Sequence, residues 1–151
     1  MDRESAPEDL IFAYHEAAHA VAGEVLTPRS ILCASLRKTG AFANFDWHPD
    51  PSSIVAYTGY DTELLDRDRM AVMVAASRPG ELLIVDRLYD SSFRGDDYQL
   101  EKVLRLSKRR IRKVRKTAAE LVTKWEASVH RVALALYDHR YLAGYEIREL
   151  L

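Results

Sequence analysis

The sequence contains only one cysteine, Cys33, among its 151 residues. This excludes an internal disulfide framework and a structural zinc site built from cysteines, and a reducing cytoplasm is the expected compartment. No run approaches the roughly 18 consecutive apolar residues of a membrane span. The charged start of the chain does not have the pattern of a signal peptide. Neither sign of charge is in excess, since 22 Lys and Arg face 23 Asp and Glu. The overall charge therefore gives no reason to expect a polyanionic partner.

The remaining composition is that of an ordinary globular domain. Hydrophobic residues make up 48% of the chain and charged residues 30%. A chain of this length can bury a sizeable core. We expect a single domain over residues 1–151 of the α+β class, mostly helical with a small β-hairpin or sheet.

Helical periodicity covers most of the chain. Residues 7–26 carry apolar side chains at three- and four-residue steps, which predicts a helix with one buried face. Ser5 is the expected N-cap of this helix, and Pro7 is expected in its first turn. Three further helical patterns lie at 66–87, with a break at 78–80, from 95–97 past 111, and at 118–137. Residues 141–147 predict a short turn followed by one or two helical turns.

The segment between the first two predicted helices has the pattern of strands and a loop instead. Residues 31–36 and 41–45 are separated by a turn signal and predict two strands of a tight hairpin. Residues 48–58 contain Pro49 and Pro51 and predict a loop. The strand at 41–45 has two interpretations of equal weight, an ordinary hairpin strand or an edge with which an extended peptide could pair.

The strongest chemical signal is His15-Glu16-Ala17-Ala18-His19, inside the first predicted helix. Side chains four residues apart project from the same face of a helix, so both imidazoles can bind one metal ion. Glu16 can reach a metal-activated water without being a ligand, and it is the candidate general base. The pattern predicts a zinc site with His15 and His19 as ligands and Glu16 as the catalytic residue.

A catalytic zinc ion needs a third protein ligand, and the sequence offers several carboxylates. Glu24 lies on the same helix but is rotated away from the histidines. Glu81 follows the predicted break at 78–80. Asp96 and Asp97 stand at the start of a later helix, where N-capping is the alternative role and is expected for one of the two. The residue pattern alone leaves Glu81, Asp96 and Asp97 open.

Residues 13–21 resemble the peptidase domain of FtsH-type ATP-dependent zinc proteases, which usually carry Gly where Ala18 stands. Residues 72–82 resemble that family's Gly-Gly-Arg-Ala-Ala-Glu-Glu-Leu helix, with Glu81 in place. Residues 95–104 resemble its Asp-Leu-x-x-Ala segment, whose Asp is the third zinc ligand. The closing helices are similar as well, so the resemblance extends over nearly the whole chain.

The resemblance implies that Asp96 or Asp97 completes the zinc site. Asp96 has the family's apolar residues at four, seven and eight positions downstream, whereas Asp97 has its apolar next neighbour, Tyr98. We favour Asp96 slightly and keep both. The sequence contains no Gly-x-x-x-x-Gly-Lys-Ser/Thr pattern, so an ATPase motor is not expected within these residues. Neither the oligomeric state nor a separate ATPase partner follows from the sequence.

Residues 102–116 contain nine Lys and Arg and no acid. Such a run can bind nucleic-acid phosphates, but the near-zero total charge favours a solvated helix face. His48, His130 and His139 lack metal-ligand spacing and are not expected to bind metal.

We therefore expect a zinc metallopeptidase resembling a stand-alone FtsH-type peptidase domain, which acts on a peptide or unfolded protein. The principal alternative is an inactive metal-binding or interaction module of the same fold. A nucleic-acid-binding protein that uses residues 102–116 is a more distant one.

Overall fold

The structure is a computed structural model that describes residues 6–36, 53–57, 67–88 and 93–151. Its central element is helix α1 (Glu8–Leu26), in which Ile11 and every residue from 13 to 24 are buried. The expectation of one buried face was therefore too narrow. Alanine and glycine fill much of α1, and such small side chains let neighbouring elements approach it from all sides. The helix begins one residue later than predicted, with Pro7 at the N-cap position.

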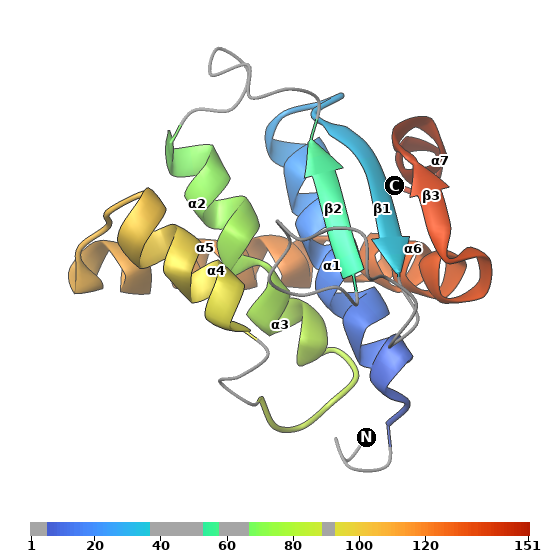
Figure 1. Ribbon diagram of the computed structural model, residues 1–151, viewed down its shortest axis with the longest axis horizontal. Helices are drawn as coiled ribbons and strands as arrows, with labels where there is room; N and C mark the ends of the chain where they lie inside the picture. The colour runs from blue at the N-terminus through green and yellow to red at the C-terminus, as the bar shows by residue number, and fades with distance from the viewer. Residues whose placement is uncertain (1–5, 37–52, 58–66, 89–92) are drawn as a thin grey trace, which may run out of the picture.

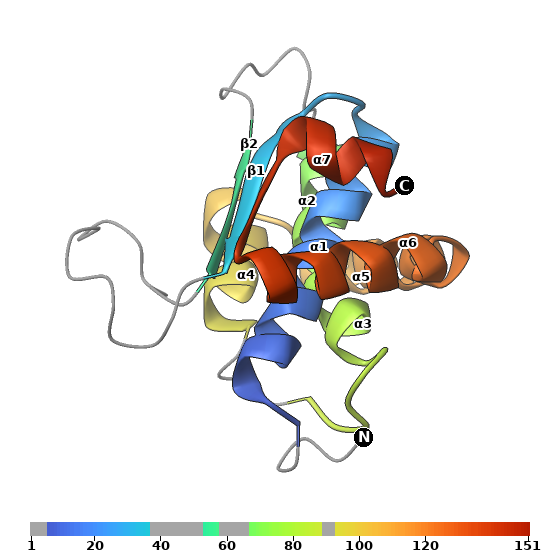
Figure 2. The ribbon, with the colours of Figure 1, turned by 90° about the vertical axis from the view of Figure 1, so that its right-hand side faces the viewer.

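A three-stranded antiparallel sheet lies on one side of α1. Its strands are β1 (Ile31–Leu36), β2 (Ser53–Tyr57) and β3 (Tyr141–Ala143), in the order β2-β1-β3. Helix α1 contacts β1 on one side and α6 (Glu126–His139) on the other. Figures 1 and 2 show this layering, with the sheet on one side of α1 and the α5–α6 pair on the other. The fold is α+β and mostly helical, as the sequence predicts.

Two of the three strands differ from the sequence-based expectation. Residues 53–57 were predicted to be part of a loop, but they pair with β1, with Leu36 opposite Ser53 and Ala34 opposite Val55. Residues 141–143 were predicted to form a turn, but they pair with the other edge of β1. Both strands are short. They are strands because they pair with β1, and not because of any two-residue periodicity in their own sequences. The predicted strand at 41–45 lies outside the described residues.

The remaining helices differ in their bounds from the sequence-based expectation, and the helix at 108–124 joins the end of one predicted helix to the start of the next. They are α2 (Arg67–Ala75), α3 (Ser77–Glu81), α4 (Arg94–Tyr98), the π-helical turn η2 (Gln99–Val103), α5 (Lys108–Lys124) and α7 (Gly144–Glu149). The predicted break at 78–80 instead falls at Ala76, and α3 ends at Glu81 rather than near 87. Pro79 is the third residue of α3, where the N–H that proline lacks would have no partner within the helix. The last long helix is divided at Trp125.

The core consists of two adjoining groups of buried side chains. The larger group joins α1, β1 and α6, and the smaller joins α2, η2 and α5. Met70 and Leu121 pack against both groups and connect them. None of the helices in the described ranges is long and apolar enough to cross a membrane.

Helix α3 approaches α1 closely at Gly80. A Cβ atom on Gly80 would lie 2.4 Å from the Cβ atom of Ala18 and 2.9 Å from the carbonyl oxygen of Tyr14. Real Cβ atoms do not come this close, so glycine is required for the two backbones to meet. This contact fixes the position of Glu81, the next residue, against α1.

We therefore expect Gly80→Ala to lower the free energy of unfolding by about 1–3 kcal/mol, because the added methyl group overpacks the α1–α3 contact. Gly95→Ala is the matched control, since a Cβ atom there meets nothing within 4 Å. Urea unfolding of both variants measures the difference. Equal stabilities would contradict the proposed steric requirement.

Candidate metal centre

His15 and His19 are both buried on α1, and the Nδ1 atom of each imidazole has a protein partner. His15 Nδ1 donates to Glu81 Oε1 at 2.9 Å, and His19 Nδ1 donates to the Met73 carbonyl oxygen at 2.8 Å. A carbonyl oxygen can only accept, so the proton of neutral His19 resides on Nδ1 and the lone pair on Nε2. Histidines that bind metals are held in this way by a second partner on the far nitrogen.

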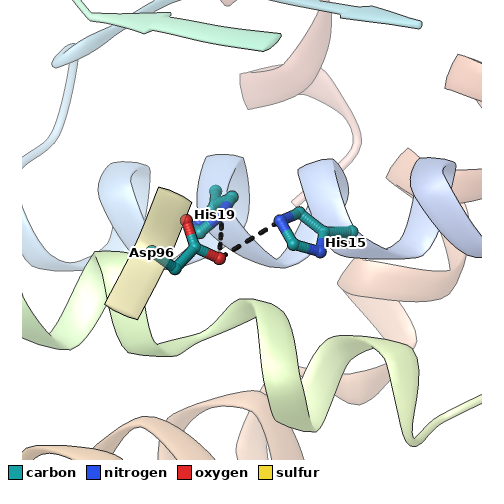
Figure 3. A group of neighbouring side chains, drawn as sticks. All are labelled: His15, His19 and Asp96. Carbon is teal, nitrogen blue, oxygen red and sulfur yellow. Dashed lines mark ion pairs between the residues drawn. The ribbon is translucent and has the colours of Figure 1, made fainter. Parts of the chain in front are cut away.

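The Nε2 atoms of both histidines face the carboxylate of Asp96, on α4. Asp96 Oδ2 lies 3.2 Å from His15 Nε2 and 3.4 Å from His19 Nε2, as Figure 3 shows. One ligand atom from each of the three residues lies within 4.8 Å of the other two. Zinc bonds of about 2.0–2.2 Å in a tetrahedron place the ligand atoms about 3.3 Å apart. The spacing and the donor set, two nitrogens and one oxygen, both fit a zinc ion.

The two histidines and Asp96 shift one another's pKa values. Burial is the largest single influence and lowers the pKa of both imidazoles, but the charge and hydrogen bonds of Asp96, with the charge of Glu16 and, for His15, a hydrogen bond to Glu81, together raise it. The pKa of His15 is consequently raised well above its usual range, and that of His19 is also raised. Burial raises the pKa of Asp96, but the two imidazoles outweigh it and hold this pKa below its usual range. A metal ion and bound protons therefore compete for the same positions.

Glu16 is also buried and lies at the edge of the cluster. Its Oε1 atom is 3.9 Å from His15 Nε2, the ring nitrogen that faces Asp96. The Glu16 carboxylate therefore lies beside the three candidate ligand atoms but is not itself one of them. This is the position that a general base needs when the water it deprotonates is held at the same centre.

Asp97 points to a different set of partners. Arg78 donates to both of its carboxylate oxygens, at 3.1 and 3.0 Å, and Arg115 donates to Oδ1 at 3.0 Å. The structure therefore brings Asp96, and not Asp97, together with the two histidines. The expectation that one of the two aspartates caps α4 was wrong: Phe93 is the N-cap residue, and α4 has no side-chain cap. Both carboxylates instead have cationic partners, which attract them more strongly than backbone amides do.

The other candidate carboxylates lie elsewhere. Glu81 is fully buried and binds the Nδ1 side of His15, opposite the nitrogen that faces Asp96. Glu24 accepts hydrogen bonds from the backbone of Arg29 and Ile31 and from the side chain of Arg148. Glu24 therefore links α1 to β1 and α7, away from the cluster, as its rotation on the helix predicts.

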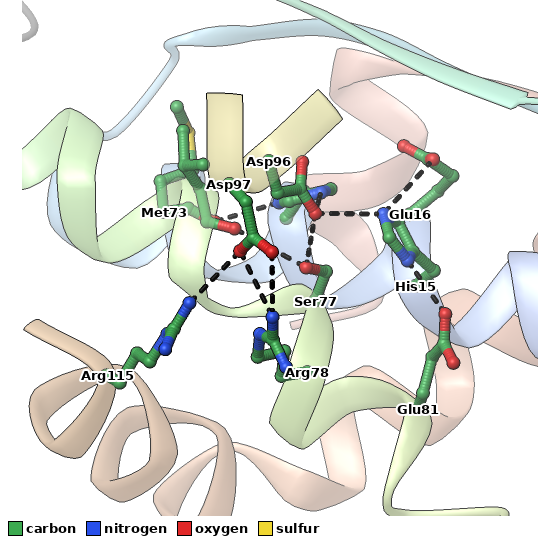
Figure 4. A network of polar contacts seen from close by, with 11 residues as sticks. His15, Glu16, Met73, Ser77, Arg78, Glu81, Asp96, Asp97 and Arg115 are labelled. Carbon is green, nitrogen blue, oxygen red and sulfur yellow. Dashed lines mark hydrogen bonds and ion pairs between the residues drawn. The ribbon is translucent and has the colours of Figure 1, made fainter. Parts of the chain in front are cut away.

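Sequence reasoning missed the residues that hold the ligands in place (Figure 4). Ser77 donates a short hydrogen bond to Asp96 Oδ2. The Phe93 ring stacks on His15 with centroids 5.6 Å apart, and the Arg78 guanidinium lies over the Phe93 ring, 4.5 Å from its centroid. Ser77 and Arg78 were indicated only by their place beside Glu81 in the segment that resembles the FtsH-type family. Nothing in the sequence pointed to Phe93.

His130 and His139, which the structure describes, do not belong to the cluster. His130 Nδ1 is hydrogen bonded to the Tyr14 hydroxyl at 2.6 Å, and His139 is the last residue of α6. His48 lies outside the described residues.

The geometry predicts different effects for the two aspartates. Asp96→Asn removes a charged ligand and should weaken zinc binding by more than about 100-fold. Asp97→Asn should change it less than about tenfold, and should lower the free energy of unfolding by about 1–2 kcal/mol through loss of the arginine pairs. Competition with a chromophoric chelator and urea unfolding measure the two quantities. Zinc loss in Asp97→Asn but not in Asp96→Asn would contradict the site.

The raised histidine pKa values predict how the metal-free protein responds to pH. A raised pKa stabilises the fold below the unfolded value of 6.5, and this stabilisation is lost as the pH rises through the folded values. The lowered pKa of Asp96 stabilises the fold above the ordinary aspartate pKa of 3.8, and this contribution is lost only as the pH falls below that value. The melting temperature measured in chelator should therefore fall as the pH rises above 6.5, and zinc should restore it. A flat profile would show that the imidazoles are not paired with Asp96.

Neither a comparison with protein-family models nor a search of curated proteins finds a match to this chain. The resemblance to FtsH-type peptidase domains consequently rests on the motifs quoted above, and the site rests on its own geometry.

Proposed function

We propose that this protein is a zinc-dependent metallopeptidase whose ligands are His15, His19 and Asp96 and whose general base is Glu16. The observation that carries the proposal is the convergence of two imidazole Nε2 atoms and one carboxylate oxygen beside a fourth, separate carboxylate. A purely structural metal site uses four protein ligands and needs no additional base. Three ligands with a nearby glutamate are typical of hydrolytic zinc sites.

A zinc ion at these ligands would supply Lewis acidity and a water of lowered pKa. Glu16 would accept the proton of that water and then deliver it to the amine of the departing peptide. Glu81 and the Met73 carbonyl hold the imidazoles by their Nδ1 atoms, so both Nε2 lone pairs would be directed to the ion. These two contacts support the proposed ligand roles of His15 and His19.

Peptide hydrolysis is the reaction class that the motifs support. The segment at 13–21 resembles the FtsH-type active-site helix, and the helical environment that the motif needs is present in α1. The proposed substrate is a peptide or an unfolded protein, the substrate class that the resemblance implies. The single cysteine, Cys33, favours a cytoplasmic location.

The test is Glu16→Gln in the zinc-loaded protein. The variant should keep its fold and zinc content but lose hydrolysis of casein or a peptide library by a factor of about 10²–10⁴, since general-base catalysis contributes that much. Glu120→Gln, an exposed change of the same kind on α5, is the control and should retain full activity. If Glu16→Gln is as active as the parent, the chain is instead a metal-binding module.

A further inference from the structure

The outer side of α5 is strongly basic. We define the basic face as the exposed side chains of Lys108, Arg109, Arg112, Lys113 and Lys116. The opposite side of the same helix, which includes Ile111, Val114 and Ala118, is buried against α2 and η2. The large apolar side chains of the helix thus lie in the core, and its outward side is mostly charged and polar.

The basic face lacks partners of opposite charge within the described residues. Among the nine cations of residues 102–116, ion pairs with described carboxylates involve only Arg110 with Asp68 and Arg115 with Asp97. The pair of Arg110 is on the surface, where such contacts are weak. The basic face is therefore a solvated helix face, as the sequence predicts, and described carboxylates do not neutralise it.

The first turn of α5 adds a second observation. It contains Lys108, Arg109 and Arg110 and no acid, although the N-terminus of a helix is the positive end of its dipole. Ser107 accepts a hydrogen bond from the backbone N–H of Arg110 and caps the helix. Like charges gathered at a positive helix end are destabilising by themselves, and a bound anion would offset that effect.

An open pocket of about 220 Å³ adjoins this helix end and is lined by Arg67, Arg105, Leu106, Ser107 and Arg110. Arginines bind phosphate through paired N–H donors, and here a phosphate would compete with the contacts of Arg67 to the Leu104 carbonyl oxygen and of Arg110 to Asp68.

We propose that the basic face of α5 and the adjoining arginine pocket bind the phosphate backbone of double-stranded nucleic acid. The face extends about 12 Å along the helix, a length over which a duplex presents about seven phosphate charges. Residues 102–116 contain no aromatic side chain on which unpaired bases could stack, and this favours a duplex over a single strand. A lipid surface is disfavoured because the apolar side of α5 is already in the core.

Binding at this surface is independent of sequence, because lysines and arginines directed at phosphates position a duplex without reading its bases. It also does not depend on the metal centre, which is a separate set of residues. An acidic polypeptide fits less well, since the basic face has no exposed apolar anchor of the kind on which protein interfaces depend.

The test is fluorescence anisotropy of a labelled random-sequence DNA duplex with the full chain, over about 50–200 mM salt. Affinity should fall steeply with salt, with each phosphate contact adding about 0.9 to the log–log slope. Arg112→Gln/Lys113→Gln should weaken binding roughly tenfold and reduce that slope by about 2. Arg87→Gln/Arg94→Gln removes two exposed arginines outside α5 and is the matched control, with the affinity of the parent expected.

Three results would overturn the proposal. One is the absence of binding at the lowest salt concentration. A second is equal loss of affinity in the two double variants, which would mean that only net charge matters. The third is displacement of the duplex by polyglutamate as readily as by unlabelled DNA, which would assign the surface to acidic polypeptides.

Discussion

The burial of ionisable side chains in the middle of α1 is the constraint on which the surrounding structure depends. His15, Glu16, His19 and Glu24 are all at most 8% exposed, although they belong to residue types that are usually solvated. A buried polar group without a partner costs about 1–3 kcal/mol. Helices α2, α3 and α4 meet this requirement by bringing the Met73 carbonyl, Glu81 and Asp96 to the two histidines. The arrangement of these helices around α1 thus follows from the partners that α1 needs.

Further contacts hold the partners of the two histidines in place. The Arg78 guanidinium lies over the Phe93 ring that stacks on His15, and it also binds the carboxylate of Asp97. Arg115 attaches the same carboxylate to α5. Neighbouring residues Asp96 and Asp97 therefore have complementary roles, one facing the histidines and the other anchoring α4 to the surrounding helices. A metal site gains affinity from such contacts, because they fix the orientation of the ligands.

Helix α5 takes part in both proposed activities through different side chains. Arg115 points inward and helps to position α4, whereas Lys108, Arg112 and Lys116 point outward. The apolar residues between these two sets, such as Ile111 and Val114, hold α5 against α2. A duplex on the outer side would consequently lie on a helix whose inner side is attached to the metal centre.

The sequence by itself determined α1, its His-Glu-x-x-His motif and the mostly helical class, because helical periodicity and i,i+4 spacing are local properties. It could not separate Asp96 from Asp97. Adjacent residues in a helix differ by about 100° in direction, and only the positions of α1 and of Arg78 and Arg115 decide which carboxylate meets the histidines. It also missed β2, β3 and the stacking of Phe93 on His15. Short strands and ring contacts are created by partners distant in the chain, so only the tertiary structure could decide them.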